Sequence, residues 1–254
     1  MSELRRICSL ALLFAVTIAA HAQKPLRIAA AADLQPLLPN IIGQFTAQTG
    51  IHVDASYKSS ATLANFIING APYDLFLAAD LSFPQKVIDA GFAEESAPVP
   101  YARGTLVLWT RNDTPFHQLS MDSLRDPALK SLAIANAQHA PYGRAAEAAL
   151  RHLGLYNTVE SKLVVAENIA QTAQYADSGN AQMGLISLTS AMTPHMRASG
   201  HYILVPRDAY PPILQGAVIM NRSFKTEAAQ KFLDFLASAP IMHQLEAAGL
   251  APPR

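Results

Sequence analysis

Short apolar strands alternate with segments of helical spacing along the chain, and this alternation constrains the fold more than any other feature. In the first part we expect strands at 26–32, 51–57 and 74–78, and helices that end at Gly50, Gly70 and Gly91. After about residue 105 we expect strands at 105–110, 132–135, 162–165, 183–187, 202–205 and 217–220, and helices at 142–153, 169–177 and through Phe232–Leu236. Strands and helices that alternate through short connections form parallel sheets with helices on their faces. The pattern predicts an α/β protein of two similar lobes.

The N-terminus has the features of a secretory signal peptide. Arg5 and Arg6 precede the apolar run Ile7–Ala20, and Ala20-His21-Ala22 provides a small-x-small cleavage site. The apolar run is too short to span a bilayer comfortably. We therefore expect residues 1–22 to be removed and the mature chain to be secreted.

Cysteine content and charge exclude several kinds of site. Cys8 is the only cysteine and lies inside the predicted signal peptide, so the mature chain has no disulfide, thiolate metal site or cysteine nucleophile. The 19 basic and 19 acidic residues show no basic stripe, and nucleic acid is not an expected partner. An anion site in such a chain has to rely on backbone donors.

Four predicted strand-to-helix junctions are candidates for that site. They are 32–34, 58–62, 139–143 and 167–169. In open α/β sheets ligands bind beyond the carboxyl ends of the strands, where each helix start exposes unpaired N–H groups and a partial positive charge. Ser59, Ser60 and Thr62 add hydroxyl donors at the second junction. Ordinary N-capping, in which a serine or aspartate satisfies only its own helix, explains any one junction equally well.

An enzyme is the weaker interpretation. Ser60, His139 and Asp74 can be drawn as a triad, but no serine lies in a G-x-S-x-G elbow. The histidines contain no H-x-x-x-H pair suited to zinc, so no metal site is predicted. A sensor domain would usually carry a membrane helix, and none is expected after residue 22. A secreted hydrolase remains the alternative from another class.

The junctions resemble those of the periplasmic molybdate-binding proteins of ABC uptake systems, from about Leu26 to Leu250. The matching stretches, in the same order and spacing, are AAAADL at 29–34, KSSATLA at 58–64, GAPYDLFLAAD at 70–80, HAPYGR at 139–144, LVVAENI at 163–169 and FLDFL at 232–236. The resemblance implies a two-lobed type II periplasmic binding protein fold, each lobe a mostly parallel sheet flanked by helices. It places lobe I at 23–104 plus 206–254 and lobe II at 105–205, with one oxyanion between them.

The resemblance also implies the ligand-binding positions, which are Asp33, Ser60, Tyr142, Ile169 and Ser187. Ser60 should donate through its hydroxyl and amide, and Tyr142 and Ile169 through their backbone N–H groups. Asp33 replaces the usual serine, and Ser187 replaces a common ligand tyrosine, for which the Tyr142 hydroxyl is a possible substitute. We favour an Asp33 that turns away and caps its own helix. The alternatives are a protonated Asp33, or one that accepts a proton from an oxyanion such as hydrogen phosphate.

The function implied is that of a monomeric periplasmic binding protein without enzymatic activity, cofactor or metal other than that of its ligand. It would capture molybdate or tungstate between its lobes and deliver it to the membrane permease of an ABC importer. Sulfate and phosphate stay open as alternative ligands, because all four anions are tetrahedral and selection among them depends on the dimensions of the cavity.

Overall fold

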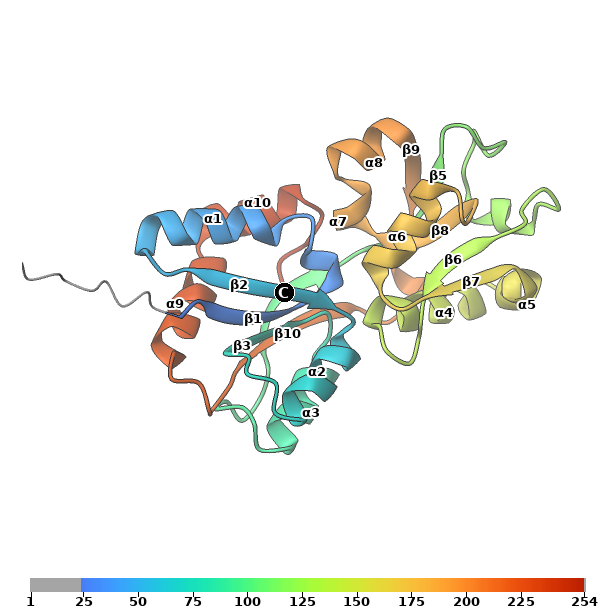
Figure 1. Ribbon diagram of the computed structural model, residues 1–254. Coiled ribbons are helices and arrows are strands. Elements are labelled where there is room, and N and C mark those ends of the chain that lie inside the picture. The colour runs from blue at the N-terminus through green and yellow to red at the C-terminus, as the bar shows by residue number, and fades with distance from the viewer. Residues whose placement is uncertain (1–23, 254) are drawn as a thin grey trace, which may run out of the picture.

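The computed structural model describes residues 24–253, which form two α/β bodies built on separate sheets (Figure 1). The sheet of lobe I has the order β2-β1-β3-β10-β4, with β1 Leu26–Ala31, β2 Val53–Lys58, β3 Leu75–Ala78, β4 Val99–Gly104 and β10 Ile213–Ile219. The sheet of lobe II has the order β7-β6-β8-β5-β9, with β5 Leu106–Arg111, β6 Leu132–Ala135, β7 Leu163–Ala166, β8 Met183–Ser187 and β9 Gly200–Leu204. The predicted α/β class with two lobes is confirmed.

Both sheets are mostly parallel, and each contains one strand of opposite direction, β10 in lobe I and β5 in lobe II. In lobe I, β1 pairs in parallel with β2 and β3, whereas β10 pairs antiparallel with β3 and β4. Lobe II repeats this arrangement, with β6 parallel to β7 and β8, and β5 antiparallel to β8 and β9. The two reversed strands, β5 and β10, are those that the chain enters just after it changes lobes. It leaves lobe I between β4 and β5, at Thr105, and returns through residues 205–212.

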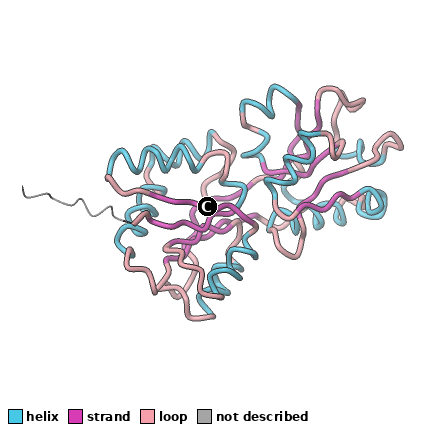
Figure 2. The backbone as a smooth tube through the Cα atoms, viewed as in Figure 1, coloured by secondary structure: helices cyan, strands magenta, loops and turns pink. Residues whose placement is uncertain are grey.

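Helices cover both faces of each sheet (Figures 1 and 2). In lobe I, α1 (Leu38–Thr49), α9 (Thr226–Leu236) and α10 (Ala239–Ala247) pack on one face, and α2 (Ser60–Ile68) and α3 (Ser82–Asp89) on the other. In lobe II, α4 (Pro141–His152) and α5 (Tyr156–Val159) pack on one face. The opposite face carries α6 (Ile169–Ser178), α7 (Leu188–Ala191) and α8 (Pro194–Ser199). None of the helices within residues 24–253 is long and apolar enough to cross a membrane.

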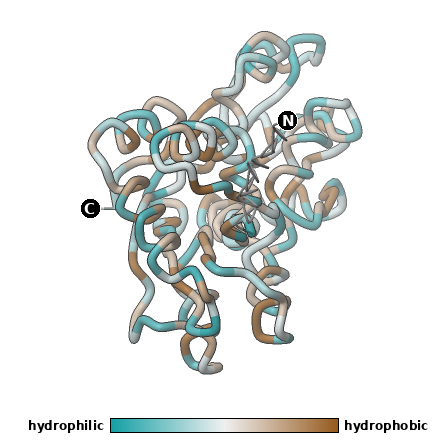
Figure 3. The backbone as a smooth tube through the Cα atoms, turned by 60° about the vertical axis from the view of Figure 1, so that its left-hand side comes forward, coloured by the Kyte–Doolittle hydropathy of each residue, from teal (hydrophilic) through white to brown (hydrophobic). Residues whose placement is uncertain are grey.

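The packing of β1 explains its uninterrupted apolar sequence. Ile28 and Ala30 face the cluster beneath α1 and α9, whereas Ala29 faces the cluster beneath α2 and α3. A strand that is buried on both faces needs apolar residues at every position, rather than at alternate ones. Hydrophobic and hydrophilic segments are accordingly interleaved along the chain instead of being collected on one side (Figure 3).

Two predicted helices are divided in the structure. The helix expected to end at Gly50 consists of a short 3-10 helix, η1 (Ala32–Leu34), and then α1, which carries Pro39 in its first turn. Gly50 ends α1 with a φ of 72°, a backbone conformation that glycine adopts without steric penalty. The C-terminal helix is divided into α9 and α10, and strand β4 was not predicted.

Candidate functional site

The four helix starts predicted from the sequence lie where the two lobes meet. Those of η1 and α2 belong to lobe I, and those of α4 and α6 belong to lobe II. The start of α7, a helix that was not predicted, joins them from lobe II. The Ala61 N–H at the start of α2 donates to the His139 carbonyl at 3.1 Å. Thr189 Oγ1 in α7 donates to the Asp33 carbonyl in η1 at 2.8 Å. Because both hydrogen bonds join one lobe to the other, the two lobes are in a closed arrangement.

A band of polar contacts closes the edge of this cleft. Thr62 Oγ1 donates to Glu167 Oε1 at 3.0 Å, and Glu167 Oε2 lies 3.6 Å from His139 Nδ1. The guanidinium of Arg144 forms an ion pair with Asp80 on the other lobe. These groups are partly exposed, so each contact contributes little by itself. Together they hold the first turns of α2, α4 and α6 in register across the cleft.

Ser60 is placed as a donor by the residue before it. Ser59 is the N-cap of α2, and its Oγ accepts the Thr62 N–H at 3.3 Å. Ser60 therefore does not cap the helix, and its buried hydroxyl accepts the Ala79 N–H at 3.0 Å instead. A hydroxyl also has one proton to donate, and no acceptor for it is recorded among residues 24–253. The geometry leaves that proton available to a ligand.

The start of α4 offers backbone donors without a side-chain cap. Pro141 has no N–H, and Ala140, the N-cap residue, makes no side-chain hydrogen bond. The amides of Tyr142 and Gly143 therefore belong to the unsatisfied first turn. Gly143 is required by the packing, because a Cβ there would lie 2.4 Å from the Ala135 carbonyl oxygen at the end of β6.

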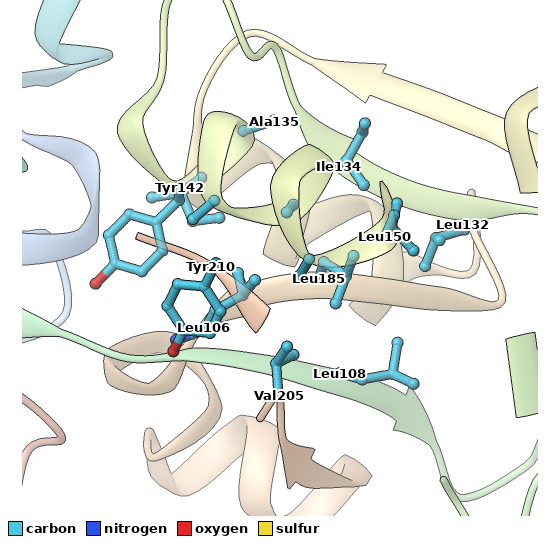
Figure 4. Close-up of a cluster of buried hydrophobic side chains, with 14 of the residues drawn as sticks. Leu106, Leu108, Leu132, Ile134, Ala135, Tyr142, Leu150, Leu185, Val205 and Tyr210 are labelled. Carbon is cyan, nitrogen blue, oxygen red and sulfur yellow. The ribbon is translucent and has the colours of Figure 1, made fainter. Parts of the chain in front are cut away.

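The side chain of Tyr142 connects the lobes. Its ring packs in the core of lobe II, and its hydroxyl points away from the surrounding leucines (Figure 4). That hydroxyl donates to Asp33 Oδ2 at 3.1 Å. The phenol can reach Asp33 only because residue 104 is glycine, since a Cβ at that position would lie 2.2 Å from the phenol oxygen. The phenol proton is therefore given to Asp33 in this structure.

The start of α6 presents its first amide beside lobe I. Asn168 is the N-cap, and its Oδ1 accepts the Gln171 N–H at 3.0 Å. Ile169 is buried in the same cluster as Ala32 and Ala79 of lobe I. The apolar side chain of Ile169 thus fixes the helix start against the other lobe, and its backbone N–H remains among the unpaired amides of the first turn.

Asp33 does not cap its own helix, contrary to the interpretation favoured from the sequence. No side chain caps η1, and Asp33 Oδ2 accepts hydrogen bonds from Tyr142 and from Gln215 Nε2 in β10. The reason is burial, since the carboxyl group is 0% exposed and needs donors from both lobes. Desolvation raises the pKa of Asp33 from its ordinary value of 3.8 to about 6, although the two hydrogen bonds act in the opposite direction.

The raised pKa predicts a pH-dependent stability that Asp33→Asn should remove. The folded state binds this proton more tightly than the unfolded chain, so the contribution is complete below pH 3.8 and is lost as pH rises through about 6. For this shift of the Asp33 pKa, the contribution to the free energy of unfolding is about 3 kcal/mol. Urea unfolding followed by the fluorescence of Trp109, the only tryptophan, should show this decline between pH 4 and 8 in the wild type and in the control, but not in Asp33→Asn. Asp234→Asn, on the exposed surface of α9, is the matched control, and equal pH dependence in all three proteins would refute the prediction.

The hydroxyl of Ser187 forms hydrogen bonds within lobe II. It is the N-cap of α7, where its Oγ accepts the Ser190 N–H at 3.3 Å, lies 2.9 Å from the Ser190 hydroxyl and lies 2.9 Å from Thr189 Oγ1. Two residues that contact Asp33 were missed from the sequence, namely Thr189 in α7 and Gln215 in β10. Gln215 was detectable as the single polar side chain in the apolar strand 213–219, and it is fully buried. Thr189 carries no such signal.

The donor set of the cleft consists of hydroxyls and backbone amides. Within residues 24–253 no three histidine, cysteine, aspartate or glutamate side chains gather in a way that would hold a metal ion. A polyatomic anion with several acceptor oxygens matches such donors, because the helix starts add partial positive charge without requiring a cationic side chain.

Comparison with known proteins defines the class of protein that carries this fold and cleft. The model of the bacterial extracellular solute-binding protein family matches residues 26–251. The chain belongs to this family, whose members bind solutes and are not enzymes. Within it, the chain is 34% identical to the molybdate-binding protein ModA of Rhodobacter capsulatus over 228 residues, covering 90% of this chain and 88% of the relative. Identity to the ModA of Azotobacter vinelandii is 35% over 224 residues, with 88% of each chain covered.

Solved structures agree with the sequence relatives. The periplasmic molybdate-binding protein of Azotobacter vinelandii superposes with a TM-score of 0.85 at 31% identity, covering 90% of this chain and all of that one. The sulfate-binding protein SubI of Mycobacterium tuberculosis superposes with a TM-score of 0.75 at 17% identity, covering 90% of this chain and 87% of that one, and this likeness concerns the fold alone. The type II periplasmic binding protein fold expected from the sequence is confirmed.

Proposed function

We propose that this chain is a periplasmic binding protein that captures molybdate or tungstate between its two lobes and delivers it to the membrane permease of an ABC importer. The observation that carries the proposal is the pair of donor-bearing helix starts in the closed cleft. Among the described residues, nothing accepts the buried hydroxyl proton of Ser60, and no side chain caps the first turn of α4. The ModA relatives, which are named for molybdate binding, supply the identity of the anion.

The ligand positions are proposed at Ser60, Tyr142 and Ile169, with Asp33 and Ser187 at the junctions beside them. Three amide-bearing helix starts support this assignment, since each adds hydrogen bonds and partial positive charge toward one anion. The lobes are proposed to comprise residues 23–104 plus 206–254 and residues 105–205. Binding would then stabilise the closed arrangement that the contacts of Thr62 and Arg144 outline.

The proposed function requires that the protein be exported to the periplasm and that it deliver the anion to a permease. Residues 1–22, the predicted signal peptide, lie outside the described residues, and their cleavage would place the protein in the periplasm. The protein is proposed to act as a monomer that presents the closed lobes to its permease. Another tetrahedral oxyanion, phosphate or sulfate, is the alternative ligand.

Titration calorimetry of the purified mature protein against four anions tests the proposal. At pH 5.5, molybdate and tungstate should bind with similar affinity, and sulfate should bind at least about 100-fold more weakly because hydrogen-bond lengths in a closed cleft tolerate little change of ligand size. Phosphate is the fourth anion. Tight binding of phosphate together with no heat from molybdate would overturn the choice of ligand, and no binding of any of the four would overturn the function.

A further inference from the structure

The carboxyl group of Asp33 is only half satisfied. Oδ2 accepts hydrogen bonds from Tyr142 Oη, at 3.1 Å, and from Gln215 Nε2. Oδ1 is buried and has no hydrogen-bond partner among residues 24–253, and the same is true of Gln215 Oε1. A buried polar atom without a partner is costly and rare in native structures, and at a binding cleft it indicates a group that the ligand completes.

The surroundings of Asp33 favour its neutral form. The groups that face it are the phenols of Tyr101 on β4 and Tyr142 on α4, the amide of Gln215 on β10 and, at its backbone carbonyl, the hydroxyl of Thr189 on α7. Burial raises the pKa of both tyrosines well above their ordinary value, so all of these groups are uncharged between pH 5 and 8. Lys58, at the end of the neighbouring strand β2, is exposed to solvent.

Protonation changes what the unpartnered oxygen can do. With Oδ2 already accepting two hydrogen bonds, the proton belongs on Oδ1, which then becomes a donor without an acceptor. An ionised Oδ1 would instead place a third negative charge beside a doubly charged oxyanion in a medium of low polarity, where like charges repel strongly. The neutral carboxyl group therefore supplies the hydroxyl donor that a serine would supply at this position.

We propose that Asp33 binds the oxyanion as a neutral acid, donating a hydrogen bond from Oδ1, so that capture of a fully deprotonated dianion at neutral pH takes up one proton from solvent. This inference rests on the proposed function and extends it by making affinity dependent on pH. The proton count balances, because one solvent proton bonds to Oδ1 and the ligand enters unprotonated. A hydrogen-bearing anion such as hydrogen phosphate can bring its own proton, so its capture requires no uptake.

Calorimetry with sodium molybdate in pairs of buffers with different ionisation enthalpies measures this proton directly. Since the pKa of Asp33 is about 6, we expect little uptake at pH 5.5 and close to one proton per molybdate at pH 8. The Kd should rise about tenfold per pH unit above pH 6. Molybdate binding at pH 8 with no proton uptake would overturn the inference but leave the proposed function intact. Absence of molybdate binding at pH 5.5 would instead count against the function.

Asp33→Asn identifies the residue that takes the proton. The amide donates at every pH, so proton uptake and the pH dependence of the Kd should both disappear, and at pH 8 the variant should bind roughly ten- to a hundredfold more tightly than the wild type. His139 and Glu167 are further titratable groups at the cleft edge. Retention of full proton uptake in Asp33→Asn would assign the proton to a group such as these and refute the role of Asp33. Asp234→Asn, far from the cleft in sequence and exposed, should behave like the wild type.

Discussion

Gly143→Ala is expected to lower the free energy of unfolding by about 3 kcal/mol or more and to weaken anion binding at least about 100-fold. The added Cβ would lie 2.4 Å from the carbonyl oxygen of Ala135 and 2.8 Å from the carbonyl carbons of Ala135 and Asn136. These are backbone atoms at the end of β6, and they cannot rotate away as a side chain can. The start of α4 must therefore move, together with the amide of Tyr142 and the phenol that reaches Asp33.

Gly43→Ala provides the matched control for this prediction. Gly43 lies in α1, and a Cβ at that position meets no atom within 4 Å. Alanine is the better helix former, so this variant should be more stable than the wild type by up to about 1 kcal/mol. Urea unfolding monitored by Trp109 fluorescence, and calorimetry with molybdate, compare the two variants. If both glycine variants retain wild-type stability and affinity, the packing of α4 against β6 does not position the site.

Ser60→Ala is expected to weaken molybdate binding roughly 10- to 150-fold, because a hydrogen bond to a charged group contributes about 1.5–3 kcal/mol. The same substitution removes the acceptor of the Ala79 N–H, which is part of a buried backbone segment. An unpaired buried donor costs about 1–3 kcal/mol, so the free energy of unfolding should fall as well. Calorimetry gives the change in Kd, and urea unfolding gives the loss of stability.

Ser238→Ala is the matched control for Ser60→Ala, because it also removes a serine hydroxyl at the start of a helix. Ser238 precedes α10, and its hydroxyl donates to the Phe235 carbonyl within lobe I rather than across the cleft. Its removal should leave the Kd for molybdate unchanged. Wild-type affinity in Ser60→Ala would show that the Ser60 hydroxyl does not bind the anion, whatever its effect on stability.

The strands and helices were largely predictable because they follow from local patterns. β6 coincides with the expected residues 132–135, and β8 with 183–187, since both are short apolar runs between turn residues. β4 was missed, because its residues 99–104 include a proline, an arginine and a glycine and show no clean alternation. Its identity as a strand depends on pairing with β10, which lies more than 100 residues away along the chain.

The helix starts that meet in the cleft were also indicated by sequence, but the role of each side chain was not. Ser59 and Ser60 are adjacent serines, and only the folded geometry makes the first a cap and the second a free donor. Gln215, which was missed, is the single polar side chain of the apolar strand β10, and its partner Asp33 lies 182 residues away. Long-range partners of this kind leave no local signature.

Asp33 is the residue for which the prediction from sequence and the structure differ most. The residue pattern places a carboxyl group at a strand-to-helix junction, where the family resemblance implies a serine, in a chain with enough apolar residues to bury it. Its position between the lobes, bound by Tyr142 and Gln215 instead of capping η1, is visible only in the folded protein. The physical reason is that capping depends on neighbours three residues away, whereas burial and pKa depend on groups that only the closed fold brings together.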